Sequence, residues 1–164
     1  MDLWFAEWAG ETAISKILVT LLVSMLPVFE LRGAIPLGVS LGLDVWPATL
    51  ISVAGNLLPI PFIILFIRRI LDWLCTKSSF LKRLIENKIR KTLRHSDKIY
   101  KSEVVGLMIF VAIPLPGTGA WTGALLAALL NIRLKVAFPA ISAGVLIAAI
   151  LVSGITYGFQ ALIS

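Results

Sequence analysis

The sequence contains few of the residues that carry catalysis or bind metals. Its 164 residues include one cysteine and one histidine, and Asp and Glu together number nine. A lone Cys75 excludes an intramolecular disulfide and a cysteine-based metal site, and His95 lies in a strongly basic segment. No HExxH motif is present, and no pair of aspartates falls within the apolar blocks. We therefore expect no enzyme, no metal site and no cofactor.

Charge is also scarce. Charged residues make up 15% of the chain, whereas 59% of the residues are hydrophobic and the mean hydropathy is +0.96. A soluble domain is usually about 45–50% apolar. The excess is gathered into long blocks, which indicates a membrane protein. The length leaves room for a single membrane domain, residues 1–164, surrounded by a lipid bilayer.

The net charge of +6 comes largely from one segment. Of the 15 Lys and Arg residues, 11 lie between Arg68 and Lys101. A basic cluster beside apolar segments marks the cytoplasmic side of a membrane, so we expect residues 68–103 in the cytoplasm and both termini outside. Residues 77–101 include an amphipathic stretch, which we expect to bind anionic lipids. The segment has no nucleic-acid module signature, so no nucleic acid is expected as a partner.

Length separates the apolar blocks into full and half crossings. A crossing of ~30 Å needs about 20 helical residues, and the shorter blocks are interrupted by Pro and Gly. We expect an all-α integral membrane protein, an inverted repeat of two re-entrant helical hairpins, each followed by a transmembrane helix. Such repeats with broken helices are typical of transporters. The expected boundaries are a first repeat 12–71 (hairpin 12–43, crossing 47–71), a basic amphipathic linker 72–103, and a second repeat 104–163 (hairpin 104–132, crossing 136–160).

The first hairpin carries two charges inside an apolar run, in the stretch PVFELRGAIPLGVSLG. A charge at membrane depth is costly and is a functional hypothesis by default. We expect Arg32 to bind an anion, because its guanidinium fork matches phosphate. We expect Glu30 at the C-terminal end of the first arm, where the helix dipole disfavours a carboxylate, and in a proton-coupling role. The alternative is a buried structural ion pair that holds the hairpin tip.

The second hairpin is interrupted at PLPGTG, residues 114–119. If both tips reach the midplane, each return helix begins there, and the two helix N-termini together favour an anion. We assign the hairpin breaks to Pro36, Pro114 and Pro116. The expected substrate-binding residues are Arg32, Gly33, Asn56, Gly117, Thr118, Gly119, Trp121 and Thr122. An interhelical hydrogen bond is the alternative for Asn56, and close helix packing is the alternative for the glycines.

The segments ELRGAIPLG and PLPGTGAWTGALLA together resemble the small multi-drug export proteins of bacteria and archaea, a family similar to the DedA (VTT-domain) superfamily. The resemblance covers nearly the whole chain. It implies two re-entrant hairpins, each followed by a transmembrane helix, in the cytoplasmic membrane of a prokaryote. DedA relatives are associated with proton-coupled movement of phosphate-bearing lipids. The chain departs from typical DedA proteins because it lacks their acidic PGE ending in the first motif and their Arg after the second proline.

We therefore expect a proton-coupled membrane transporter that moves an anionic or phosphate-bearing lipid or small molecule through a midplane site between the two hairpin tips. Two alternatives remain open. One is a small multidrug exporter of cationic compounds, for which Glu30 supplies a carboxylate while Arg32 repels the substrate. The other is a lipid-binding membrane scaffold that transports nothing. Because a chain this small encloses little by itself, a homodimer is a further hypothesis.

Overall fold

The computed structural model describes residues 12–77, 96–115 and 117–163, and all regular structure within these ranges is helical. The all-α prediction is confirmed for this part of the chain. Pro116, the N-terminal residues 1–11 and most of the predicted amphipathic helix (78–95) lie outside the described residues. The helices are α2 (Ala13–Met25), α3 (Glu30–Ser40), α4 (Val45–Leu57), α5 (Ile60–Lys77), α7 (Ser96–Ala112), α8 (Ala120–Leu129) and α9 (Leu134–Ile163).

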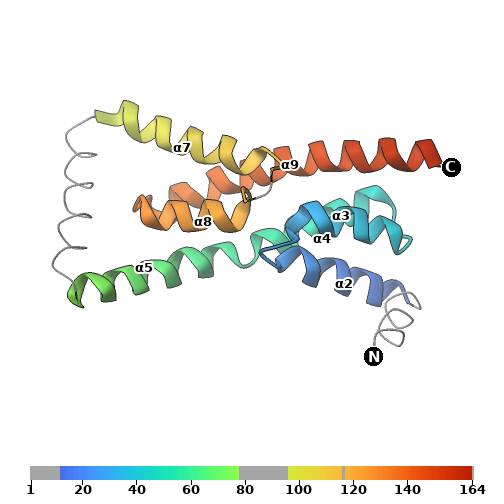
Figure 1. Cartoon of the computed structure of the whole chain (residues 1–164), viewed down its shortest axis with the longest axis horizontal. Coiled ribbons are helices and arrows are strands. Elements are labelled where there is room, and N and C mark those ends of the chain that lie inside the picture. Colours follow the sequence, from blue (N-terminus) through green and yellow to red (C-terminus); the bar gives the residue numbers. More distant parts are fainter. Residues whose placement is uncertain (1–11, 78–95, 116, 164) are drawn as a thin grey trace.

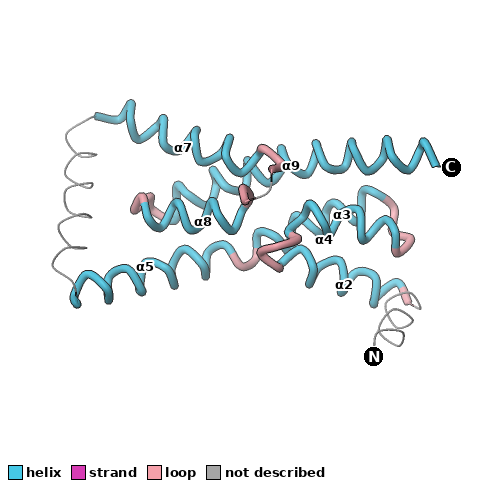
Figure 2. Tube along the Cα trace, in the orientation of Figure 1, coloured by secondary structure: helices cyan, strands magenta, loops and turns pink. Residues whose placement is uncertain are grey.

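The helices form an elongated bundle (Figure 1). Helix α9 runs along its length, and α4 continues into α5 in the opposite direction. The pair α2–α3 covers one half of this length and the pair α7–α8 covers the other half. The loops that join the members of each pair lie near the middle of the bundle, where Figure 2 shows two groups of non-helical residues. Both interruptions of the hairpins therefore come together at mid-length.

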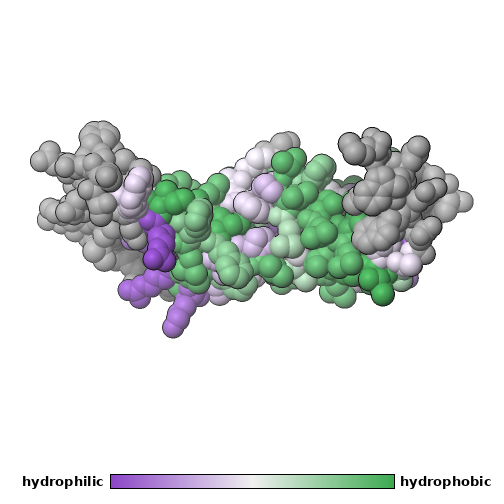
Figure 3. Space-filling view, turned by 90° about the horizontal axis from the view of Figure 1, so that it is seen from below, coloured by the Kyte–Doolittle hydropathy of each residue, from purple (hydrophilic) through white to green (hydrophobic). Residues whose placement is uncertain are grey.

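Within the described residues, two stretches of helix are long and apolar enough to cross a membrane. They are Val45–Ile70, which combines α4 with most of α5, and Leu134–Phe159 in α9, each with a hydropathy of 2.3. Each contains 26 residues, whereas a crossing needs about 20. Figure 3 shows apolar side chains over much of the described surface, with hydrophilic ones gathered toward one end. This distribution fits a surface that faces lipid.

Local sequence explains where the first elements begin and end. Thr12 caps α2 by accepting a hydrogen bond from the Ser15 N–H at 3.2 Å. Helix α2 ends at Met25, two residues before Pro27, as proline disfavours helix for the residue that precedes it. Gly42 has a φ of +89°, which permits the turn between α3 and α4.

Five predicted features differ from the structure. The first hairpin turns at residues 26–29, so ELRG begins α3 instead of forming the turn. Pro36 lies inside α3, where it is exposed, and is not the break. The predicted crossing 47–71 is divided at residues 58–59, because Pro59 has no backbone N–H with which to continue the helical hydrogen bonds. Helix α7 begins at Ser96, inside the predicted linker, and α9 extends beyond the predicted crossing at both ends.

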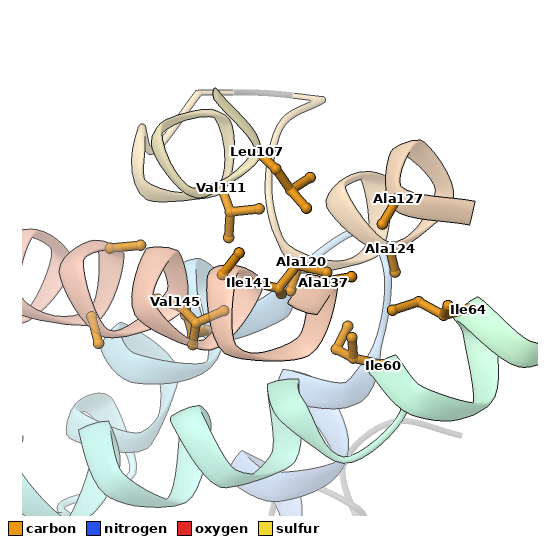
Figure 4. Packing of buried hydrophobic residues seen from close by; sticks show 14 of the residues in the cluster. Ile60, Ile64, Leu107, Val111, Ala120, Ala124, Ala127, Ala137, Ile141 and Val145 are labelled. Carbon is orange, nitrogen blue, oxygen red and sulfur yellow. The ribbon is translucent and has the colours of Figure 1, made fainter. Parts of the chain in front are cut away.

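Small residues form the contact between the second hairpin and the long helices. Ala120, Ala124 and Ala127 of α8 are fully buried in a cluster with aliphatic residues of α5, α7 and α9 (Figure 4). Gly144 of α9 lies so close to α7 that a Cβ would stand 2.6 Å from the Met108 carbonyl oxygen. Close backbone approach of this kind is common where helices associate in membranes. The packing holds the N-terminus of α8 near the middle of the bundle.

Candidate functional site

Arg32 binds the C-terminal end of α7. Its Nη2 donates to the carbonyl oxygen of Ile113 at 3.0 Å and to that of Val111 at 3.5 Å, and its Nη1 donates to the Leu115 carbonyl. The guanidinium also contacts Thr118, through its carbonyl at 3.2 Å and its hydroxyl at 3.1 Å. Because α7 ends here, these carbonyls lack the N–H donors that a further helical turn would supply. Arg32 therefore places its charge at the negative end of the α7 dipole.

Glu30 binds the opposite end of the same break. Its carboxylate accepts a hydrogen bond from the Trp121 N–H at 3.0 Å, in the first turn of α8, and the residue is 4% exposed. The backbone of Glu30 has a φ of 48°, in the left-handed region, which costs a non-glycine residue about 1–2 kcal/mol. Strained residues of this kind are concentrated at functional sites. The prediction that Glu30 ends the first arm is wrong, because this residue begins α3.

Gly119 makes room for the Glu30 carboxylate. A Cβ on Gly119 would stand 2.0 Å from Glu30 Oε2, and the residue has a φ of +124°. Both facts favour glycine. Gly117 also has a positive φ, +83°, but a Cβ there would meet nothing within 4 Å. Gly117 and Gly119 thus have different roles, since Gly119 admits a carboxylate and Gly117 only permits a turn.

Trp121 links the second hairpin to the first. Its indole Nε1–H donates to the carbonyl oxygen of Met25, the last residue of α2, at 3.1 Å. The same residue gives its backbone N–H to Glu30. The Trp121 side chain therefore bonds to a carbonyl at the C-terminal end of α2. Its backbone N–H, at the N-terminal end of α8, bonds to the Glu30 carboxylate.

A cleft of about 410 Å³ opens between the two hairpin tips. Predicted site residues on both breaks line it, together with apolar residues that the prediction missed. The lining residues are Pro27, Val28, Phe29, Glu30, Arg32, Gly33, Pro114, Leu115, Gly117, Thr118 and Thr122. Three of the missed residues, Pro27 to Phe29, belong to the turn before ELRG, which the sequence analysis assigned to the first arm, and the fourth, Leu115, belongs to the second break.

The electrostatics of the cleft differ from the prediction in one respect. We expected helix N-termini and Arg32 to be available to an anion, but the N-terminus of α8 is capped by Glu30, and Arg32 bonds to backbone carbonyls. Of the guanidinium nitrogens, buried Nε has no hydrogen-bond partner among the described residues. The two charges and the two helix ends therefore balance one another in this conformation.

Asn56 lies away from the cleft lining. It is 0% exposed in α4, and neither atom of its amide has a hydrogen-bond partner among the described residues. Among the described residues the amide therefore makes no interhelical hydrogen bond, and Asn56 is not one of the residues that line the cleft. It belongs instead to a group of buried polar side chains in α4 and α9.

Arg68 is a capping residue that sequence reasoning missed. Its Nη2 donates to the carbonyl oxygen of Ile132, just after the C-terminal end of α8. The sequence reading counted Arg68 only as the first member of the basic cluster. The position of Arg68, directly after an apolar run, suggested a special role for this arginine. Nothing in the sequence indicated which carbonyl it would bind.

The segment GVSLG, residues 38–42, has the spacing of a hydrolase nucleophile elbow. That motif requires a serine on a sharp turn between a strand and a helix, with a histidine as base. Here Ser40 ends α3, and its exposed hydroxyl donates to the Leu37 carbonyl at 2.7 Å. The spacing is therefore a coincidence of helix sequence, and no catalytic role follows from it.

The fold and the cleft define a helical membrane protein whose two interrupted hairpins meet at mid-length. The chain belongs to the family described as "Putative small multi-drug export protein", whose model matches residues 30–151. The match begins at Glu30, directly after the first hairpin break, and includes the second break and the cleft residues Glu30, Arg32 and Thr118. No curated protein and no solved structure matches the chain. Membership of an export family makes the chain a membrane transporter at this coarse level and leaves its substrate open.

Proposed function

We propose that the protein transports its substrate through the cleft between the hairpin tips, and that the two hairpins are re-entrant members of an inverted repeat. The support is geometric. Each hairpin extends over half of the bundle, from opposite ends, and each precedes a helix stretch long enough to cross the membrane. Interrupted helices at membrane depth are tolerated where they line a cavity, and transporters use them at their substrate sites.

The observation that carries the proposal is the carboxylate at the N-terminus of α8. Helix N-termini bind anions through free N–H groups and the positive end of the dipole. In this conformation the anion is the protein's own Glu30, at 3.0 Å from the Trp121 nitrogen. A site that accommodates one carboxylate has the chemistry to accommodate the phosphate or carboxylate of a substrate. The preferred substrate is therefore an anionic or phosphate-bearing lipid or small molecule.

Proton exchange at Glu30 links substrate binding to coupling. A proton taken up by the carboxylate removes its charge and weakens its bond to the α8 N-terminus. The anionic group of the substrate then takes over these donors, and Arg32 lies nearby in the same cleft. When the substrate leaves, Glu30 loses its proton and returns. The proposed cycle thus moves one proton with each exchange of the two anions.

We further propose that a second copy of the chain covers the tips. Val28, Phe29 and Leu115 are exposed at the cleft rim, 84%, 52% and 55% respectively. Around them the backbone is irregular, and irregular backbone within the hydrocarbon region requires protein or water as cover. The proposed orientation has residues 68–103 in the cytoplasm of a prokaryotic cell, both termini outside, and anionic lipids bound by residues 77–101.

The test uses purified protein in vesicles with a pH-sensitive dye inside. We expect a phosphate-headed lipid or an organic phosphate to drive proton movement by the wild type. Glu30→Gln is expected to retain binding and lose proton movement, since its amide oxygen still accepts the Trp121 N–H. Arg32→Gln is expected to lose binding. Substrate-driven proton movement by Glu30→Gln at the wild-type rate would refute the proposed coupling.

A second candidate is export of cationic compounds. The family description favours it, and Glu30 supplies a carboxylate in the cleft. In the same vesicles, a quaternary ammonium drug is the probe. Proton movement with the drug, and none with the phosphates, would select this candidate. No response to either class would leave the lipid-binding scaffold as the remaining hypothesis.

A further inference from the structure

Buried polar atoms without partners are concentrated in one interface of this molecule. Apart from two arginine Nε atoms, those found among the described residues are the Ser52 hydroxyl, the Asn56 amide oxygen and nitrogen, and the Ser142 hydroxyl. Ser52 and Asn56 belong to α4, and Ser142 belongs to α9. A buried polar group without a partner costs about 1–3 kcal/mol. Several in one place indicate a bound polar ligand.

The helix geometry places these residues along one α4–α9 interface, with Asn56 nearer to Ser142 and Ser52 one turn farther away. Ser52 and Asn56 are four residues apart and therefore share one face of α4. Thr49 on the same helix contacts Ser153 of α9, with their hydroxyl oxygens 2.6 Å apart. The two helices run in opposite directions (Figure 1). With a rise of about 1.5 Å per residue, Asn56 lies opposite a point about one helical turn from Ser142.

A backbone carbonyl joins the group at the same level. The carbonyl of Gly55 would normally accept the N–H four residues later, but that residue is Pro59, which has none. The interruption between α4 and α5 follows directly, at residues 58–59. The C-terminal end of α4 also carries partial negative charge. Hydroxyl, amide and carbonyl oxygens thus gather at the negative end of a half-helix.

We propose that Gly55, Asn56 and Ser142 form a sodium site at the interruption between α4 and α5, about one helical turn from Ser52. Neutral oxygen donors suit a monovalent cation, whereas calcium and magnesium sites normally include carboxylates. Freed carbonyls and half-helix C-termini coordinate sodium in transporters. The proposal does not rest on the function proposed for the cleft, because its residues lie on other helices and its ligand is a different ion.

The experiment measures the Tm of the detergent-solubilised full chain in sodium, lithium, potassium and choline chloride at equal ionic strength. We expect a saturable rise in sodium, about 5 °C over choline at a concentration 100-fold above Kd. Asn56→Ala and Ser142→Ala are expected to remove or greatly reduce this rise. Ser153→Ala is the matched control: it deletes a hydroxyl that has a partner in the same interface, and it should retain the full rise.

Two results would overturn the proposal: an equal Tm of the wild type in all four salts, and a full sodium response in Asn56→Ala. An equal wild-type Tm in all four salts together with a lower Tm of Asn56→Ala would indicate bound water alone. If Asn56→Ala does not fold, Ser142→Ala decides the matter. A sodium response in a protein that ignores every cleft substrate would support this site while refuting the proposed function of the cleft.

Discussion

The two hairpin breaks satisfy their helix ends in different ways. In the first, the Leu26 N–H donates to the Val23 carbonyl at 3.1 Å and the Glu30 N–H donates to the Leu26 carbonyl at 2.9 Å, so the turn is stabilised largely by its own backbone. The second break, residues 113–119, also has local bonds, such as that from the Leu115 N–H to the Ile113 carbonyl at 2.9 Å, but in addition it bonds to Arg32 and Glu30 of the other hairpin. The first hairpin is therefore the supporting element, and the second acquires its conformation by contact with it.

The contacts of the second break also revise the interpretation of Glu30 and Arg32. The sequence analysis offered two interpretations of Glu30 and Arg32, a transport role and a structural ion pair. Neither interpretation predicted that the two side chains would bond to the ends of helices in the other hairpin. The carboxylate meets the positive end of α8 and the guanidinium meets the negative end of α7. One motif of the first hairpin thus holds both ends of the second break. A movement of this motif would release both, which connects the contacts to a transport cycle.

The largest effect is expected for Gly119→Ala. The new Cβ would overlap the Glu30 carboxylate, at 2.0 Å, and φ of +124° disfavours alanine. Strain and loss of the carboxylate contact together should lower the free energy of unfolding by about 3–5 kcal/mol. Thermal denaturation in detergent measures this effect. Gly117→Ala is the control, with positive φ but open space, and should cost only about 1 kcal/mol.

The reverse order of these two losses, or equal losses, would contradict the proposed fit between Gly119 and the Glu30 carboxylate. If Gly117→Ala destabilises the protein as much as Gly119→Ala, the conformation of the loop matters and the fit of the carboxylate does not. The double variant Gly119→Ala with Glu30→Ala supplies a second readout. Removal of the carboxylate relieves the overlap, so the two changes should be less than additive.

Arg32→Gln comes next, because it removes the donors that satisfy the end of α7. Several carbonyls lose a charged partner, and we expect a loss of about 2–4 kcal/mol in the free energy of unfolding. Arg32→Lys retains the charge but not the fork, and should lose less. A fully stable Arg32→Gln that no longer binds substrate would instead assign Arg32 to the cleft alone.

Much of the architecture followed from the sequence, because length and hydropathy are read directly from it. The long apolar stretches of α5 and α9 and the interruption at PLPGTG were predicted, and the family was identified from ELRGAIPLG and PLPGTGAWTGALLA. Both motifs line one cleft. The physical reason is that proline and glycine interrupt helices wherever they disrupt the backbone ladder.

The partners of individual groups could not be predicted. Glu30 was expected at a helix end of the wrong polarity, since a turn at Pro27 and a turn after Glu30 are both compatible with the local sequence. Pro36 was expected at a break but lies within α3, where it removes one backbone N–H without ending the helix. The carbonyls bound by Arg32 and Arg68 belong to the backbone, which carries no mark in the sequence.

Arg68 and Arg69 together test what stabilises the C-terminal end of α8, a specific hydrogen bond from Arg68 or the positive charge of the region. Arg68 donates to the Ile132 carbonyl, whereas Arg69 is exposed. We expect Arg68→Gln to lower the free energy of unfolding by about 1–2 kcal/mol and Arg69→Gln by less than about 0.5 kcal/mol. Tm values at low and high salt check the pair. Equal losses that disappear at high salt would indicate a surface charge effect.

The smallest effect is expected at the hydrogen bond that Trp121 of the second hairpin donates to the first hairpin. Trp121→Phe retains the ring and removes the Nε1–H that donates to the Met25 carbonyl at 3.1 Å. A neutral hydrogen bond contributes about 0.5–1.5 kcal/mol, so the Tm should fall slightly while substrate binding is unchanged. Trp46→Phe is the matched control, since Trp46 is 78% exposed. A loss larger than that of Arg32→Gln would reverse the comparison and make the second hairpin the supporting element.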